Sequence, residues 1–347
     1  KRYGLGILSS DCISSSAYGS EQILIALLPA FGLAAFAILM PMTAIVLVIL
    51  LIITLSYRDV INVYTKVGGA YIVSRDNFGP VVAQVAAVAL MLDYIVTIAI
   101  QSAAGVAAII STFPSLSPYK IPMILVVICL LTYGNLRGVK EAGKAFALPT
   151  YFFVACMFIV FSVGLYKQFN GTLIQLSVEQ PGAIEIGQEQ GLLTVAAIFI
   201  LLRAFANGGS SLTGLEAISD GVGLFKAPEH VNARRTLYIM STLLGTLVLG
   251  VSWFAHKIHA VPYETGTPTV ISQIAKTIMG DGVVGQTMFV MVQLATMLIL
   301  FAGANTTYSA FPILVNFVAQ DGYLPRQLTK RGHRLAFSNG ILLLAGG

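Results

Sequence analysis

Long apolar segments alternate with short polar connections along the chain. A helix needs about 20 predominantly apolar residues to cross a bilayer core, and eight segments approach or exceed this length. They lie at residues 5–29, 32–56, 80–112, 121–135, 146–166, 193–225, 236–256 and 282–318. A ninth begins near residue 335 and is expected to be cut short at Gly347. The pattern predicts an all-α integral membrane protein.

The composition supports this prediction and narrows the class of protein. Hydrophobic residues make up 56% of the chain, charged residues only 10%, and the mean hydropathy is +0.84. Soluble domains carry about a quarter charged residues, so a water-soluble enzyme is excluded. The three cysteines lie in apolar segments and are interpreted as small buried hydrophobic residues. We therefore expect no enzymatic activity and no cofactor.

Basic residues are distributed unevenly between the two sides that these segments define. If the N-terminus is cytoplasmic, the outer connections contain only Lys120, Lys167, Lys257 and Lys276. Cytoplasmic connections are usually the basic ones, so we expect a multi-pass protein with a cytoplasmic N-terminus. The net charge of +5 then reports topology, and binding of nucleic acid has no support.

Two of the segments contain runs of small polar residues, SSDCISSSAYGSEQ at 9–22 and FANGGSSLTGLEAISDG at 205–221. Such runs free backbone polar groups, which a membrane tolerates where they line a cavity or bind a ligand; close packing of small residues is the alternative. Residues 14–23 and 209–218 share Ser, Ser, Gly, Glu and Ile at equivalent positions. The second copy lies five segments after the first, an odd offset, so the copies would enter the membrane from opposite sides, as in the inverted repeats of secondary transporters.

Ionisable residues inside the predicted segments are few and mostly acidic. They are Asp11, Glu21, Asp93, Arg203, Glu216 and Asp220. Charges at membrane depth are costly and usually mark a site or pathway, and this set favours a cation. Structural roles stay open: Glu21 could bond the break that it follows, and Asp220 could be hydrated. Arg203 could neutralise Asp11 or Asp93, or form a structural pair.

One face of the segment at 80–112 carries oxygen atoms, because Asp93, Thr97 and Gln101 recur every four residues. With Asp11 and Tyr18, these groups could replace the water shell of a weakly hydrated cation. Hydrogen bonding between helices is the alternative. A transporter without an ATP site needs an ion gradient, and we favour Glu216 as the group that takes up and releases a proton.

Several motifs resemble the amino acid-polyamine-organocation superfamily, namely YTKVGGAYIVSRDNFG at 64–79 and NLRGVKEAG at 135–143. More narrowly, ILSSDCISSSAYGSEQIL, LDYIVT, SSLTGLEAIS and RGHRLAFSNGI resemble the KimA-type potassium importers, which are proton-coupled symporters of bacterial plasma membranes. The resemblance implies a LeuT-like five-plus-five inverted-repeat fold with discontinuous helices 1 and 6 and a chain that stops within helix 9. It divides the chain into a first repeat at 1–166, an extracellular connection at 167–192 and an incomplete second repeat at 193–347.

The resemblance also assigns roles to residues of this chain. Its implied potassium ligands are Asp11, Tyr18, Asp93, Tyr94, Thr97 and Thr213, and its proton-coupling group is Glu216. Where the family has a Ser one turn after Thr97, this chain has Gln101 with Ser102 beside it, and we include both. The resemblance implies no resident cofactor, with K+ and H+ as transported ions.

The expected function is therefore import of potassium ions by proton symport across the plasma membrane. An amino-acid or polyamine permease that uses the same central site is the alternative, and a membrane ion sensor is a third. A carboxylate substrate would be repelled by Asp11, whereas an ammonium group would suit the acids and tyrosines. The expected partners are the two ions, the lipid bilayer and a second copy of the chain, bound through a C-terminal region absent here.

Overall fold

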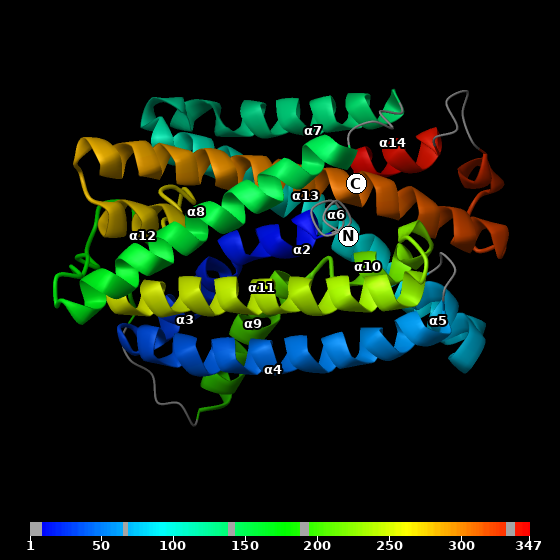
Figure 1. The fold of residues 1–347 in the computed structure, drawn as a ribbon, viewed down its shortest axis with the longest axis horizontal. Helices are drawn as coiled ribbons and strands as arrows, with labels where there is room; N and C mark the ends of the chain where they lie inside the picture. The colour runs from blue at the N-terminus through cyan, green and yellow to red at the C-terminus, as the bar shows by residue number, and fades with distance from the viewer. Residues whose placement is uncertain (1–8, 65–68, 138–142, 188–193, 331–336) are drawn as a thin grey trace.

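The computed structural model describes residues 9–64, 69–137, 143–187, 194–330 and 337–347. Within these ranges the chain is almost entirely helical, and the long helices lie roughly side by side (Figure 1). The longest are α4 (Ala34–Val63), α6 (Pro80–Thr112), α7 (Lys120–Leu136), α8 (Gly143–Phe169), α11 (Glu229–Ile258) and α13 (Val283–Gln320). Each coincides with a predicted apolar segment, which confirms the prediction of an all-α fold.

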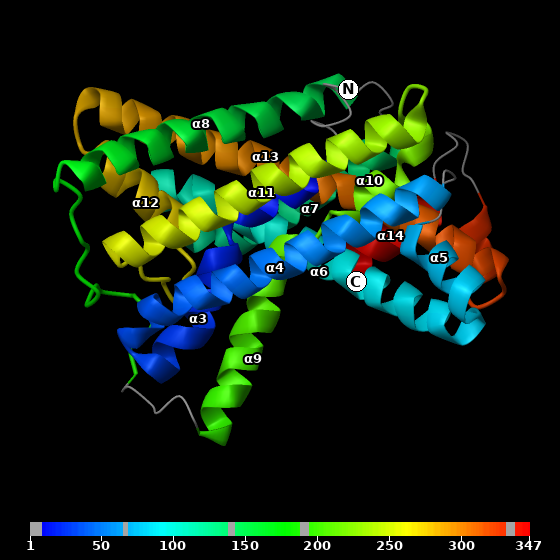
Figure 2. The ribbon, with the colours of Figure 1, turned by 60° about the horizontal axis from the view of Figure 1, so that its bottom comes forward.

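The two segments with small polar runs are broken, as predicted. The first consists of α2 (Ser10–Ser14), the 3-10 turn η1 (Ser15–Ala17) and α3 (Gly19–Phe31). The second consists of α9 (Val195–Gly209), η4 (Ser210–Leu212) and α10 (Glu216–Asp220). Figure 2 shows α9 leaving the bundle at a steep angle to the long helices.

Three short helices complete the fold: α5 (Gly69–Phe78), α12 (Val270–Met279) and α14 (Ser338–Gly346). The start of the expected ninth segment corresponds to α14. Helix α5 lies in a region interpreted as a connection, and it ends where Gly79 adopts φ +83° and Pro80 opens α6. Glycine tolerates this left-handed conformation and proline suits the first turn of a helix, so the FGP sequence sets the boundary.

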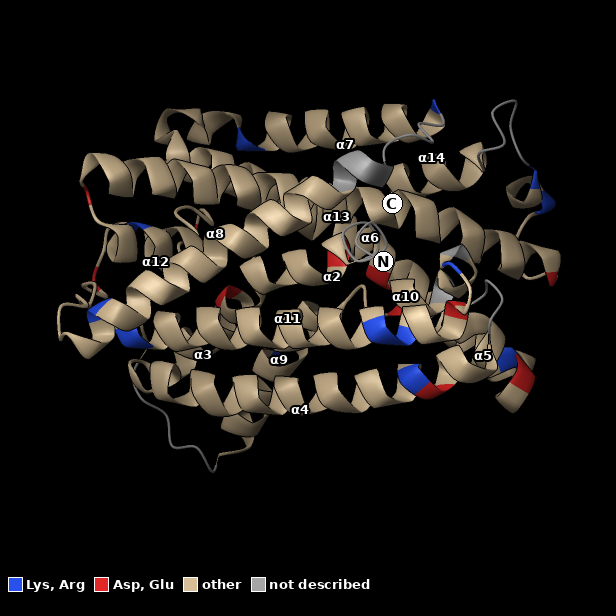
Figure 3. Ribbon diagram, in the orientation of Figure 1, with Lys and Arg blue, Asp and Glu red and all other residues tan. Residues whose placement is uncertain are grey.

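Seven helical segments of the described residues are long and apolar enough to cross a membrane. The broken first segment is not among them because its pieces are short. Figure 3 shows that charged positions gather near the two ends of the bundle and that few lie along its middle. The chain is thus a membrane protein, and its interior acids stand out against an apolar background.

The broken helices lie against the long helices that carry the predicted oxygen donors. Helix α2 contacts α8, α11 and α13, while α13 packs along α6. Helix α3 packs against α9, so the second part of the first broken segment lies beside the first part of the other broken segment. Every residue from Ser9 to Glu21 is buried. The first break therefore lies at the centre of the protein.

Candidate functional site

Serine side chains hold the first break together. The hydroxyls of Ser14 and Ser16 donate to the carbonyl oxygens of Asp11 and Ile13, each at 2.7 Å. Ser15 donates to the Cys12 carbonyl at 2.6 Å and to the Ser211 carbonyl of the second break at 2.7 Å. Buried carbonyl groups need a partner when a helix is interrupted, and the serine-rich sequence supplies one.

The second break is more open and lies directly on the first. Thr213 is extended, with φ −64° and ψ 156°, and Gly214 has φ +81°. A Cβ atom on Gly214 would lie 2.7 Å from the Cys12 nitrogen and 2.9 Å from Asp11 Cγ. A Cβ atom on Gly19 would lie 2.5 Å from Ser211 Cβ. The two glycines therefore permit the broken helices to cross at close range.

The crossing brings Asp11 against α6. Gln101 Nε2 donates to Asp11 Oδ1 at 2.5 Å and to Ser14 Oγ at 3.1 Å. Gln101 is fully buried, and its Oε1 has no hydrogen-bond partner among the described residues. The carboxamide thus stabilises the Asp11 carboxylate with its nitrogen and leaves an oxygen available to a cation.

Other predicted ligands gather beside this pair. The Tyr18 hydroxyl donates to the Ser210 carbonyl at 3.5 Å and also lies against the side chains of Thr213 and Gln101. Asp93 is near enough to interact electrostatically with Asp11. Thr97 is buried one turn from Gln101 on the same face of α6. The structure therefore brings together oxygen donors from three elements that are distant in sequence.

Two predicted residues lie in different surroundings. The Tyr94 ring packs edge-to-face on Phe311 of α13, with centroids 6.5 Å apart, within a separate apolar cluster. Ser102 is fully buried, and its hydroxyl has no partner among the described side chains. The geometry therefore gives Tyr94 an apolar packing contact, whereas Ser102 retains a free oxygen.

Glu216 opens α10 immediately after the second break. It is 8% exposed, and it acts electrostatically on Cys12 together with Asp11. Helix α10 contacts α4, α5 and α11. Helix α10, which Glu216 begins, thus connects the crossing to α5.

The electrostatics of the site are negative. Neither Asp11 nor Asp93 forms an ion pair with a Lys or Arg in the described part of the chain. Arg203, which could have neutralised either acid, is exposed on α9, and that alternative is wrong. The side chain of Asp220 and most of the 135–143 motif lie outside the described residues. A buried carboxylate (Asp11) and a half-buried one (Asp93), both without a basic partner among the described residues, favour a cation at the site.

Comparison with known proteins agrees with this architecture. The amino acid permease family model matches residues 5–347. This chain belongs to that family. It is 41% identical over 345 residues to the potassium transporter KimA of Bacillus subtilis (strain 168), which covers 99% of the chain and 54% of KimA. The chain therefore spans about half the length of this relative. The LeuT-like fold expected for amino acid permeases fits the helical arrangement.

Two residues of α13 beside the candidate site were missed by sequence reasoning. Gly303 of α13 faces the Gln101 side chain, and one turn later Thr307 has a buried hydroxyl without a partner among the described residues. The sequence feature that could have indicated these residues is the small polar run GANTTYS at 303–309 within an apolar segment. Helix α13 is therefore a further wall of the candidate site.

The side chain of Glu21 bonds a helix outside the first broken segment. Its Oε2 accepts a hydrogen bond from the Val270 backbone nitrogen at 3.3 Å, at the first turn of α12. The expectation that Glu21 bonds the break that it follows is therefore wrong. No sequence signal connected these residues, because α12 was not predicted.

Proposed function

We propose that this protein imports potassium ions across the plasma membrane by proton symport. The observation that carries the proposal is the gathering of Asp11, Tyr18 and Gln101 at the crossing of two broken helices, without a basic residue to neutralise the acid. The described relative KimA is a potassium transporter. The sequence identity between KimA and this chain supports potassium as the substrate.

Potassium is a large and weakly hydrated cation, so a ring of oxygen atoms can replace its water shell. Asp11 and Asp93 supply charge, Tyr18, Thr97 and Thr213 supply hydroxyls, and Gln101 and Ser102 supply neutral oxygens. In the arrangement described here Gln101 donates to Asp11. Rotation of its carboxamide would direct Oε1 toward an arriving ion. The Tyr94 ring packs on Phe311, and its hydroxyl is a further proposed ligand.

Proton coupling requires a group that changes charge between the two states of the transport cycle. Glu216 meets this requirement because it is buried and begins the helix that follows the second break. In the proposed cycle, proton release from Glu216 accompanies ion release to the cytoplasm. The repeats at 1–166 and 193–347 would move relative to each other around this centre, with the N-terminus cytoplasmic.

A permease for an amino acid or a polyamine is the second candidate, and the amino acid permease family match favours it. The extended Thr213 and the left-handed Gly214 resemble the unwound helices that bind substrates in transporters. Asp11 opposes a substrate carboxylate at the crossing. A polyamine fits the acids better.

Uptake by the full-length protein in K+-depleted proteoliposomes tests the proposal. We expect K+ entry to increase with an inward proton gradient, and Glu216→Gln to abolish that dependence. Asp93→Asn and Tyr18→Phe should reduce uptake at least about tenfold, as expected for loss of a charge or a hydrogen bond at a ligand. Asp281→Asn, an exposed acid outside the site, is the matched control.

Three results would contradict the proposal. Normal K+ uptake in both Asp93→Asn and Tyr18→Phe would show that these residues do not form the ion site. Uptake of a labelled polyamine or amino acid without K+ uptake would show that the same site binds an organic substrate, as the second candidate function requires. Gradient-driven uptake that persists in Glu216→Gln would place the coupling group elsewhere. The proposed dimer is tested separately, by the mass of the detergent-solubilised full-length protein.

A further inference from the structure

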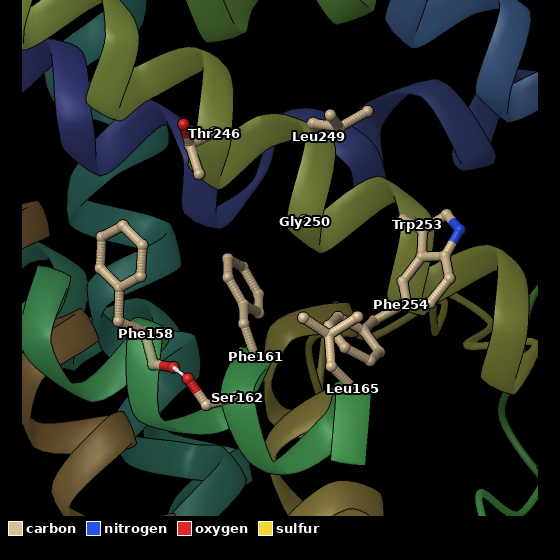
Figure 4. Close-up of a pocket in the computed structure, with 9 residues that line it drawn as sticks. All are labelled: Phe158, Phe161, Ser162, Leu165, Thr246, Leu249, Gly250, Trp253 and Phe254. Carbon is tan, nitrogen blue, oxygen red and sulfur yellow. Dashed lines mark hydrogen bonds between the residues drawn. The ribbon is translucent and has the colours of Figure 1, made fainter. Parts of the chain in front are cut away.

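A groove of about 420 Å³ lies between α8 and α11, away from the candidate ion site. Figure 4 shows Phe158, Phe161 and Leu165 of α8 facing Leu249 and Trp253 of α11 across it. Phe158, Leu165 and Leu249 are each more than 40% exposed. The groove is therefore an open apolar hollow on helices that are candidates to cross the membrane.

The two hydroxyl groups of the groove are already paired within their own helices. Ser162 donates to the Phe158 carbonyl at 2.7 Å, and Thr246 donates to the Thr242 carbonyl at 2.8 Å. Neither hydroxyl offers its proton to a ligand. An apolar chain thus suits the groove better than a polar solute does.

The floor of the groove is fixed by reciprocal contacts between aromatic rings and glycines. The rings of Phe161 and Phe254 stack with centroids 5.6 Å apart. A Cβ atom on Gly250 would lie 2.4 Å from Phe161, and one on Gly164 would lie 2.5 Å from Phe254. The absence of two side chains lets the rings approach the opposite helix. The shape of the groove is consequently fixed by the packing of α8 against α11.

The length of the groove corresponds to one leaflet of a bilayer. Its lining on α11 runs from Thr246 to Phe254, which is about 12 Å along a helix axis. The hydrocarbon core of a bilayer is about 30 Å thick. A single acyl chain of one leaflet would therefore lie along the groove.

Positive charge is concentrated at one end of the groove. Lys257 follows Trp253 by one turn, and its Nζ lies 5.9 Å from the indole ring centroid. Lys167 follows Leu165 of the lining, and the Leu176 nitrogen after α8 bonds the Ile258 carbonyl at the end of α11. Neither lysine forms an ion pair with an acidic residue in the described ranges. These cations favour an anionic group beside an apolar chain.

We propose that this groove is a binding site for an anionic phospholipid, with one acyl chain between α8 and α11 and the headgroup phosphate at Lys167 and Lys257. The indole of Trp253 lies at the boundary between the two parts, which is the usual position of tryptophan in membrane proteins. The site is independent of the transported substrate, because none of its residues lines the candidate ion site.

Trp253 provides the test, since it is the single tryptophan of the chain. The full-length protein, with any other tryptophan replaced by Phe, would be reconstituted in phosphatidylcholine vesicles that contain brominated phosphatidylglycerol or brominated phosphatidylcholine. Bromine quenches indole fluorescence at short range. We expect brominated phosphatidylglycerol to compete for the site about threefold to tenfold better, because lysines near a membrane surface each favour anionic lipid.

Two variants separate the parts of the site. Lys167→Ala with Lys257→Ala should reduce the preference to about one, and Lys276→Ala, an exposed lysine of α12, should leave it unchanged. Thr246→Phe should weaken quenching by both lipids equally, because it fills the end of the groove far from the lysines. Equal quenching by both lipids in the unmodified protein would overturn headgroup recognition. Absence of quenching by either lipid would show that protein, such as a second copy, covers the groove.

Discussion

The two broken helices share a sequence pattern but differ in structure. At the first break the chain passes through one 3-10 turn, and Tyr18 is followed at once by α3. At the second break Thr213 is extended and Gly214 is left-handed before α10 begins. Gly19 and Gly214 occupy equivalent positions in the two runs. Identical residues in a repeat therefore do not have identical roles.

The difference follows from what each glycine contacts. Gly19 is the first residue of α3 and meets a side chain, that of Ser211. Gly214 meets the Cys12 backbone and the base of Asp11. A side chain can be shortened, whereas a backbone cannot. The first break thus needs space at its glycine, and the second needs both space and a backbone conformation that other residues rarely adopt.

The largest expected effect comes from replacing each glycine by alanine, which separates the need for space from the need for a left-handed backbone. Gly214→Ala should lower the free energy of unfolding by at least about 2 kcal/mol and abolish uptake, because left-handed strain adds to a backbone clash. Gly19→Ala should cost about 1 to 3 kcal/mol by overpacking. Ser211→Gly should rescue Gly19→Ala, since it removes the atoms that clash, and should not rescue Gly214→Ala.

Denaturant unfolding and K+ uptake of the full-length protein measure both effects. The comparison fails if Ser211→Gly restores both alanine variants or neither of them. Ser211→Gly alone is the necessary control, because the Ser211 hydroxyl itself bonds the Gly208 carbonyl.

Sequence patterns were sufficient for the long helices but not for the contacts between them. Apolar length located α4, α6 and α13, and the serine-rich and glycine-rich runs located both breaks. The pairing of Asp11 with Gln101 depends on how α2 crosses α6, and no spacing along one helix specifies this. Tyr94 illustrates the limit: the family resemblance implies a potassium ligand, but no pattern along the sequence indicates that its ring packs on Phe311.

The next effect concerns the support that α6 gives to the first break. Gln101→Leu removes the donor to Asp11, and a hydrogen bond to a charged group contributes about 1.5 to 3 kcal/mol. We expect the stability in K+-free buffer to fall by this amount. Added K+ should stabilise the variant less than it stabilises the unmodified protein, because the variant also lacks the Gln101 oxygen that is a proposed ligand of the ion.

Gln84→Leu is the matched control for this prediction. Gln84 also lies on α6, but it donates to the uncharged Tyr71 hydroxyl at 3.2 Å. Loss of this hydrogen bond should cost about 0.5 to 1.5 kcal/mol, and K+ should stabilise this variant as much as it stabilises the unmodified protein. If K+ stabilises the two variants equally, Gln101 is not a ligand of the ion.

A smaller effect distinguishes the aligned glutamates. Glu21 accepts from the Val270 nitrogen at the start of α12, where a carboxylate also stabilises the helix dipole. Glu21→Gln should therefore cost about 0.5 to 1 kcal/mol. Hydrogen exchange at residues 270–273 should become faster, with the proton dependence of uptake unchanged. If Glu21→Gln removes proton coupling as Glu216→Gln is expected to do, the two glutamates are equivalent after all.

The smallest expected effect tests whether K+ uptake is sensitive to substitutions only near the two breaks. Asp321, just after α13, accepts from the Tyr71 hydroxyl at 2.6 Å and from Arg75 at 2.9 Å. The hydrogen bond from Tyr71, with help from Arg75, holds the pKa of Asp321 below its ordinary value of 3.8. A lowered pKa in the folded state means that the stabilisation is complete above pH 3.8 and is lost as the pH falls through the folded value.

Stability between pH 5 and pH 8 should therefore not change through Asp321, and any pH dependence of uptake in this range must come from other groups. Asp321→Asn should cost less than about 1 kcal/mol, as usual for a partly exposed ion pair, and should leave K+ uptake intact. Denaturant unfolding at pH 7 and at a pH well below 3.8 measures this, with the variant losing its difference from the unmodified protein only at the acidic end. A large loss of uptake would instead show that the link between α5 and α13 takes part in the transport cycle, and that function depends on more of the molecule than the two breaks.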